Sequence, residues 1–480
     1  GLPAAEPRAM GGGSAQVFPP HVVSPLDGLR AALGDGVELD FVPALDARTK
    51  LPPMRDDAEL HVEVSDASGA VRHREAVADA MINWMGEYPG GADLGDIAQV
   101  RLSGTFTPRV AGRHEFAVAG IGAFEFAVDG AALFNGMLRP ESEEVVTAFV
   151  DPPEHRVVVD LAADVPIEVS VTRTVPDDSG ISRTLLSRMI SFRIGHADPI
   201  PDVDTGIEQA VEAAAAADVA IVAVATTEAV ESEGFDRTSL RLPGRQDELV
   251  ARVAAANPNT VAVVSAGSPV EMPWAAEVPA ILLTWFGGQE LGAALADVLT
   301  GTHEPGGRLP TTWPKTLADA PVSNVDPSGG ELRYDEGIFI GYRAWRRGET
   351  EPAFWFGHGL GYTDWTYGEA SFEADGADER LGGVSVTVTN SGDRGGREVV
   401  QVYLASESDE DDRPERWLAG FTSVSAAAAE SATATVSIPR RAVQVWDPRS
   451  HSWHTRAGRY TLQIGHSVAD IRVSVPITVA

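Results

Sequence analysis

Two glutamates lie close together in a short loop whose residue types could support acid–base chemistry. The loop reads Glu231-Ser232-Glu233-Gly234-Phe235-Asp236-Arg237. A Glu beside a glycine can reach into a cleft, and burial or a second carboxylate nearby raises its pKa and makes it a better proton donor. Cleavage of a glycosidic bond needs such an acid, together with a second carboxylate at the sugar. The same residues also suit a solvated acidic loop with an Asp236–Arg237 ion pair, and the pattern alone leaves both interpretations open.

The stretch that contains this loop has the pattern of alternating helices and strands. Helix formers fill residues 206–216, 244–255 and 288–299, whereas continuous apolar runs fill 218–225, 260–265 and 280–286. Strands that are apolar at every position are covered by helices on both faces, so this order predicts a parallel, doubly wound α/β sheet. Ligands of such sheets bind beyond the carboxyl ends of the strands. We therefore expect the functional groups in the loops after Ala225, Ser265 and Phe286.

Two further regions have an all-β pattern. In the first, short strands are predicted at 99–107, 112–119, 123–128 and 156–161; in the second, at 383–390, 398–404, 432–438 and 459–464, as in a fibronectin-type sandwich. A helix at 24–33 and a strand at 37–42, both of α/β type, precede the first β region, which therefore interrupts the α/β domain. The predicted domains are the start of the α/β sandwich (1–47), an inserted β-sandwich (48–196), the remainder of the α/β sandwich (197–367) and a fibronectin type III-like domain (368–480).

Composition narrows the choice of partners. The 480 residues carry a formal net charge of −33, and lysine occurs only at Lys50 and Lys315, so neither nucleic acid nor an anionic membrane is expected as a partner. The absence of cysteine excludes disulfides and thiolate metal sites, and no apolar run is long enough to span a bilayer. The acidic run 407–415 lacks the glycine and the bidentate Glu spacing of an EF-hand, which favours a solvated loop over a calcium site. We predict no cofactor and no metal, and the compartment is not distinguished.

Short motifs follow one another in a fixed order through the whole chain. They are Gly11-Gly12-Gly13-Ser14-Ala15, Glu233-Gly234-Phe235-Asp236-Arg237, Gly287-Gly288-Gln289-Glu290, Pro305-Gly306-Gly307-Arg308-Leu309-Pro310, Gly341-Tyr342-Arg343, Phe356-Gly357-His358-Gly359-Leu360 and Glu398-Val399-Val400-Gln401-Val402-Tyr403. As an ordered set they resemble the C-terminal portion of the β-glucosidases of glycoside hydrolase family 3. Within 48–196, Gly104, Phe106, Gly112, Phe116 and Asp129-Gly130 resemble a protective-antigen-type domain, which some members of the family carry at this point.

The resemblance implies a retaining, exo-acting β-glucosidase in which Glu233 is the general acid/base, with Glu231 as the runner-up. The family's nucleophile is an Asp on an N-terminal barrel, near a Ser/Thr-Asp-Trp string. Thr363-Asp364-Trp365 is the matching string here, but it ends the α/β sandwich and is not in a barrel strand. The chain begins abruptly at Gly1, without an initiator Met or a signal-peptide pattern. We therefore expect the barrel to be missing and the isolated chain to be inactive.

The expected partners follow from the same resemblance. They are a β-glucoside or small oligosaccharide as substrate and the N-terminal barrel domain of the same enzyme. An apolar sheet edge left by a missing strand would also give the chain a tendency to form homo-oligomers. The alternative is a non-catalytic carbohydrate-binding or adhesion assembly of two β-sandwiches on an α/β core. The intact loop around Glu233 argues against that alternative, because a pure binding protein needs no acid/base loop.

Overall fold

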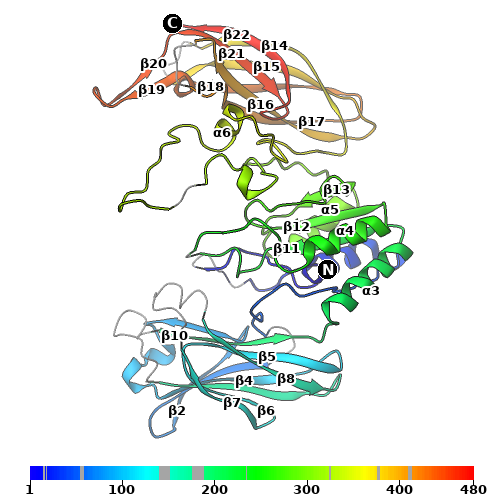
Figure 1. Ribbon diagram of the computed structural model, residues 1–480, viewed down its shortest axis with the longest axis vertical. Coiled ribbons are helices and arrows are strands. Elements are labelled where there is room, and N and C mark those ends of the chain that lie inside the picture. The colour runs from blue at the N-terminus through cyan, green and yellow to red at the C-terminus, as the bar shows by residue number, and fades with distance from the viewer. Residues whose placement is uncertain are drawn as a thin grey trace.

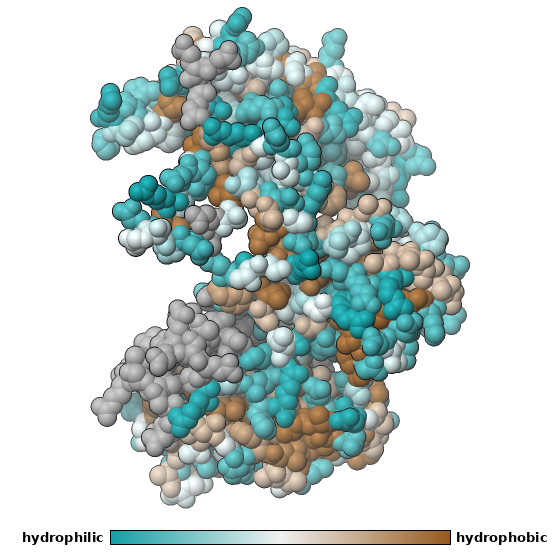
Figure 2. All heavy atoms as spheres, in the orientation of Figure 1, coloured by the Kyte–Doolittle hydropathy of each residue, from teal (hydrophilic) through white to brown (hydrophobic). Residues whose placement is uncertain are grey.

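The computed structural model arranges the chain in three parts along its long axis (Figure 1). A β-sandwich lies at one end, an α/β part in the middle and a second β-sandwich at the other end. The structure describes residues 1–13, 17, 19–54, 59–139, 152–175, 189–233, 235–323, 326–375, 379–408 and 413–480. No helix within these ranges is long and apolar enough to cross a membrane. The visible face is largely hydrophilic, with apolar patches over the first β-sandwich and between the middle and last parts (Figure 2).

The α/β part is built on a parallel sheet with the strand order β11-β12-β13. Its elements are η1 (Leu2–Ala4), α1 (Pro25–Leu33), η3 (Gly34–Gly36), α3 (Val203–Ala216), β11 (Ala220–Ala225), α4 (Gln246–Ala256), β12 (Thr260–Ser265), β13 (Ala280–Leu283), α5 (Leu291–Leu299), η7 (Leu317–Asp319) and α6 (Tyr342–Arg347). Apolar side chains of α3 and α4 pack with those of β11 and β12 in one core. The predicted doubly wound alternation of helices and strands is confirmed.

Local sequence signals explain where these helices begin and how closely they pack. The Ser24 hydroxyl caps α1 by accepting a hydrogen bond from the backbone N–H of Asp27 at 3.1 Å, and Pro25 occupies the first turn.

Helix α1 packs on α5 at a point where both helices have a glycine. A Cβ on Gly28 would lie 2.2 Å from the carbonyl oxygen of Gly292. The two backbones can approach this closely only because neither residue has a side chain.

Two expectations about this part of the chain need correction. The predicted strand at 37–42 is not a strand, because the apolar residues there find no ladder partner among the described residues. The cover of the sheet is also incomplete: β12 is buried, but Ile221 in β11 is 36% exposed and no residue of β13 is fully buried. A continuous apolar run therefore predicted the strands themselves better than it predicted their burial.

The first β-sandwich consists of two antiparallel sheets, with the orders β2-β1-β4-β9-β6-β7 and β3-β10-β5-β8. Its elements are β1 (Glu59–Ser65), β2 (Val71–Val77), β3 (Met81–Met85), η4 (Pro89–Gly91), η5 (Leu94–Asp96), β4 (Gln99–Phe106), β5 (Gly112–Gly120), β6 (Gly122–Val128), β7 (Ala131–Leu138), β8 (Glu154–Leu161), β9 (Ile167–Thr174) and β10 (Met189–Ala197). Alternate residues of these strands point inward and form a single core between the sheets.

The chain enters and leaves this sandwich along one path. The backbone N–H of Met54 donates to the carbonyl of Ile194 at 2.8 Å, and the N–H of His196 donates to the carbonyl of Pro52 at 3.1 Å. The entering segment therefore pairs with the last strand, β10, immediately before the chain returns to α3. This is the arrangement expected of a domain inserted into a loop.

The C-terminal β-sandwich has a three-stranded sheet, β14-β15-β18, and a four-stranded sheet, β17-β16-β21-β22. Its elements are β14 (Trp365–Ala374), β15 (Arg380–Asn390), β16 (Gly396–Ser406), β17 (Trp417–Ala426), β18 (Ser431–Pro439), η8 (Arg440–Val443), β19 (Gln444–Asp447), β20 (Ser452–Thr455), β21 (Gly458–Gly465) and β22 (Ile471–Val479). β19 and β20 form a separate hairpin. The predicted fibronectin-like sandwich is confirmed.

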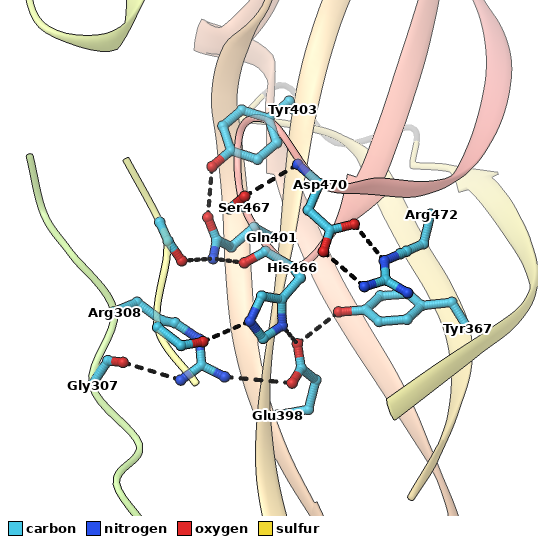
Figure 3. A network of polar contacts seen from close by, with 12 residues as sticks. Gly307, Arg308, Tyr367, Glu398, Gln401, Tyr403, His466, Ser467, Asp470 and Arg472 are labelled. Atoms are coloured by element: carbon cyan, nitrogen blue, oxygen red, sulfur yellow. Dashed lines mark hydrogen bonds and ion pairs between the residues drawn. The ribbon is translucent and has the colours of Figure 1, made fainter. Parts of the chain in front are cut away.

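A buried polar network joins this sandwich to the α/β part (Figure 3). The carboxylate of Glu398, which is fully buried, lies 3.4 Å from a guanidinium nitrogen of Arg308 and 2.7 Å from Nδ1 of His466. The hydroxyl of Tyr367 donates to the same carboxylate at 2.8 Å. Nε2 of His466 lies 2.6 Å from the carbonyl oxygen of Gly359. Both ring nitrogens of His466 thus face oxygen acceptors.

Candidate active site

Loops that follow all three parallel strands meet at the carboxylate of Glu231. Thr226 directly follows β11, and Gly267 and Ser268 lie just beyond β12. Phe286, after β13, packs so closely on Gly267 that a Cβ there would lie 2.6 Å from its ring. The loops that the strand-end rule singles out therefore lie together at one edge of the sheet.

Glu231 is held by hydrogen bonds from several directions. Its carboxylate accepts from the hydroxyls of Ser268 at 2.5 Å and Thr226 at 2.6 Å, and from the backbone N–H of Gly267 at 3.0 Å. Burial alone would raise the pKa of Glu231, but these hydrogen bonds and the charge of Arg237 hold it below its ordinary value. An ionised, multiply hydrogen-bonded carboxylate is a poor proton donor at neutral pH, so this geometry suits an anchor.

Two arginines complete the surroundings of Glu231. The Arg8 guanidinium donates to the carbonyl oxygens of Gly11 and Glu231, both at 2.6 Å, and lies 4.5 Å from the centre of the Phe286 ring. Arg237 donates to the Ser268 hydroxyl at 2.7 Å. Burial lowers the pKa of Arg8, an effect that the charges of Glu228 and Glu231 oppose. Arg8 thereby ties the N-terminal glycine loop to the Glu231 loop.

Glu233 lies two residues further along, on the exposed part of the same loop. It packs against the N-terminal glycine loop: a Cβ on Gly13 would lie 2.8 Å from both Cβ and Oε2 of Glu233. Gly13 also has φ +61°, a conformation that favours glycine. Ser14 and Ala15, which the motif of that loop included, and Gly234 lie outside the described residues. The structure thus brings the glycine loop and the loop of Glu231 and Glu233 together.

Backbone strain marks the strand end next to this cluster. Trp285 has φ +52°, an uncommon value for a bulky residue, and its carbonyl oxygen accepts a hydrogen bond from the Ser265 hydroxyl at 2.8 Å. Strained residues of this kind concentrate at functional sites. The strained residue thus lies at the same edge of the sheet as the cluster around Glu231.

Several residues of the cluster had no signal in the sequence. Ser268 and Gly267 could have been suspected only from their position just after an apolar strand. Arg8 lies more than 200 residues from the loop that it anchors, and no local pattern connects the two. Such contacts depend on tertiary structure and cannot be read from spacing.

The other sequence candidates lie elsewhere. Thr363 bonds to Asn390 and Trp365 is buried in the C-terminal sandwich, so the Thr363-Asp364-Trp365 string is structural there. The prediction of a solvated loop at 407–415 falls partly outside the described residues, which omit 409–412.

Comparison with known proteins gives the family. Residues 1–362 match the Glycosyl hydrolase family 3 C-terminal domain, and residues 398–468 match the Fibronectin type III-like domain. A beta-glucosidase of Rhizobium radiobacter is 37% identical over 99% of this chain and 58% of its own length. Beta-glucosidase B of Emericella nidulans is 35% identical over 97% of this chain and 57% of its length. The chain thus spans less than two thirds of these relatives.

Solved structures agree with the sequence comparison. A beta-glucosidase of Kluyveromyces marxianus in complex with glucose superimposes with a TM-score of 0.88 at 29% identity, covering 99% of this chain and 58% of the other. DesR, a beta-glucosidase of Streptomyces venezuelae, superimposes with a TM-score of 0.68 at 27% identity, covering 100% of this chain and 55% of the other. The chain belongs to glycosyl hydrolase family 3, and its residues correspond to the C-terminal domains of beta-glucosidases of that family.

Proposed function

We propose that this chain is the C-terminal part of a retaining, exo-acting β-glucosidase and that Glu233 is its general acid/base. The observation that carries the proposal is the contrast between the two glutamates of one loop. Glu231 is a half-buried anchor whose hydrogen bonds favour its ionised form, whereas Glu233 is on the exposed part of the loop, against Gly13. A general acid must release its proton to the departing oxygen and recover it from water, which an exposed carboxyl can do.

In this proposal Glu231 acts as a positioning residue. Its hydrogen bonds to Thr226, Gly267 and Ser268 connect the loop to the ends of β11 and β12. A proton donor held this way keeps a fixed direction, and small displacements of reacting groups cost large factors in rate.

The nucleophile is proposed to lie on an N-terminal barrel outside this chain. A retaining pair places its carboxyl groups about 5–5.5 Å apart, so the barrel would have to present an Asp close to Glu233. In the segment that precedes α6, whose yellow-green ribbon projects from the molecule in Figure 1, several large apolar residues are exposed. They are Leu332 (42%), Tyr334 (75%), Ile338 (48%) and Ile340 (54%). Exposed apolar residues this close together are typical of a surface that another domain covers, and we assign this segment to the barrel interface.

The isolated chain should then have little or no activity. Without the nucleophile an entire covalent step is missing, and general acid catalysis alone contributes at most about 10²–10⁴-fold. Adding the separately produced barrel domain should restore turnover of an aryl β-glucoside. Full turnover by the chain alone would contradict the division of roles between two domains.

The assignment of Glu233 is tested by leaving-group dependence in the barrel-containing enzyme. Glu233→Gln should slow the hydrolysis of alkyl glucosides, whose leaving group must be protonated, by several orders of magnitude. It should slow the hydrolysis of aryl glucosides with acidic leaving groups much less. Glu231→Gln is the matched control: it should slow all substrates by a similar factor, because it disturbs the position of the loop. The reverse pattern would make Glu231 the acid. Glycan binding without turnover would instead support a non-catalytic carbohydrate-binding assembly.

A further inference from the structure

Two histidines and an aspartate meet where the first β-sandwich returns to the α/β part. His114 lies in β5, His196 in β10, and Asp198 just after β10 on the way to α3. Nδ1 of His114 is 3.0 Å from Nε2 of His196 and 3.4 Å from a carboxylate oxygen of Asp198, which lies 3.8 Å from the same Nε2. Within the described parts of the chain, this is the group of three His, Asp or Glu side chains with ligand atoms close enough to share one metal ion.

The three separations match the edges of a zinc coordination polyhedron. Zinc binds imidazole nitrogen and carboxylate oxygen at about 2.0–2.2 Å in a tetrahedron, and two ligand atoms at such distances lie about 3.3–3.5 Å apart. The observed values of 3.0, 3.4 and 3.8 Å surround that figure. Shifts of a few tenths of an ångström would therefore place all three atoms in the first coordination sphere.

The hydrogen bonds of His114 already present the correct nitrogen. Its Nε2 lies 2.7 Å from the carbonyl oxygen of Val110, which accepts a hydrogen bond and so places the proton on Nε2. The lone pair of Nδ1 then points at His196 and Asp198. A metal-bound histidine usually donates its other N–H to a carbonyl or carboxylate in this way.

His196 is equally suited to bind a cation. Its Nε2 faces Nδ1 of His114 at 3.0 Å and a carboxylate oxygen of Asp198 at 3.8 Å. The ring packs on Phe106 and Phe116, with centroids 4.4 and 4.8 Å away, and these apolar neighbours fix its orientation. In the absence of an ion, Nε2 of His196 can donate a hydrogen bond to Nδ1 of His114. A metal ion bound between the two nitrogens would displace that proton.

The cluster is open on one side only. The side chain of His114 is fully buried and that of His196 is 11% exposed, but the Asp198 side chain is 49% exposed. Asp198 is therefore the side through which an ion from solvent reaches the cluster. Two imidazoles and one carboxylate with an open site are a ligand set that zinc accepts.

We propose that His114, His196 and Asp198 bind one Zn²⁺ through Nδ1, Nε2 and the carboxylate, respectively. The ion would link β5 of the inserted sandwich to the segment that leads into α3. It would thereby fix the sandwich relative to the α/β part and stabilise the junction between them. None of the three residues belongs to the cluster around Glu231.

The test uses the full chain, freed of metal by dialysis against a chelator, and Zn²⁺ alone as the probe. Calorimetric titration should give one Zn²⁺ per chain, and zinc should raise the melting temperature. Co²⁺ should bind at the same site and give the visible absorption of a tetrahedral centre. Asp198→Asn removes a ligand at a half-exposed position, so folding should survive; it should weaken Zn²⁺ binding at least about tenfold and remove most of the thermal shift.

The matched control is Asp297→Asn, which alters an exposed His–Asp pair elsewhere. His303 and Asp297 are 3.3 Å apart, but their side chains are 73% and 46% exposed, and no third ligand among the described residues joins them. This variant should bind Zn²⁺ as the wild type does. The proposal would be overturned if the wild type bound no stoichiometric Zn²⁺, which would leave a plain histidine–histidine hydrogen bond, or if Asp198→Asn bound Zn²⁺ unchanged.

Discussion

Replacing Glu398 with Gln should weaken the C-terminal sandwich and its junction with the α/β part. The carboxylate is fully buried and faces the Arg308 guanidinium at 3.4 Å and Nδ1 of the His466 ring at 2.7 Å. Glutamine keeps the shape but removes the negative charge, and its amide NH₂ must point at one of these donors. The guanidinium of Arg308, only 8% exposed, would then be buried without its counter-charge.

The size of the effect follows from these contacts. Breaking a buried ion pair by changing one partner costs about 3–5 kcal/mol, and a hydrogen bond to a charged group contributes about 1.5–3 kcal/mol. The long 3.4 Å contact with Arg308 favours the lower end, about 3 kcal/mol. For the C-terminal sandwich, a loss of about 3 kcal/mol corresponds to a fall of roughly 10 °C in its melting temperature.

Differential scanning calorimetry of the full chain provides the measurement, because the transition of the C-terminal sandwich should shift most. Glu369→Gln, an exposed position in β14 of the same sandwich, is the matched control and should change stability by less than about 0.5 kcal/mol. If both variants melted at the same temperature, the buried network would contribute nothing and the reasoning would fail.

Three further predictions concern the site and the core. Because the pKa of Glu231 is lowered in the folded state, the unfolded chain takes up the proton first as pH falls, and the stability that Glu231 contributes is lost on acidification. The difference in unfolding free energy between wild type and Glu231→Gln should therefore stay constant from pH 7 to about pH 5 and shrink below about pH 4.5. Gly13→Ala should leave the chain folded by circular dichroism but lower kcat of the barrel-complemented enzyme about tenfold, because the new methyl meets Glu233 at 2.8 Å; an unchanged kcat would refute this contact. Gly28→Ala should destabilise the chain by about 2 kcal/mol or more in chemical denaturation, since its Cβ would lie 2.2 Å from a backbone oxygen of α5, whereas Gly36→Ala, with open space around it, should not.

Elements specified by local sequence were predicted well. The apolar run at 260–265 becomes β12 over the same residues, and the helix expected at 24–33 becomes α1 (Pro25–Leu33). These features depend on periodicity, capping and turn residues that lie within a few positions of one another.

Features that depend on distant partners were not predictable. Residues 37–42 have the composition of a strand, yet strand formation requires a neighbouring edge that the sequence does not reveal. The role of Glu231 depends on Ser268, 37 positions away, and Glu398 meets Arg308 across 90 positions. The family resemblance indicated Glu233, but only the three-dimensional contacts explain why its neighbour Glu231 is suited to hold the loop.

The most direct test of the account is product analysis of Glu233→Ala, in the barrel-containing enzyme, with an activated aryl β-glucoside and added azide. If Glu233 is the acid/base, the first step still occurs, and azide attacks the glycosyl-enzyme to give β-glucosyl azide with an increased rate. If α-glucosyl azide forms instead, Glu233 is the nucleophile. If azide has no effect and turnover stays at the wild-type level, Glu233 takes no part in the reaction.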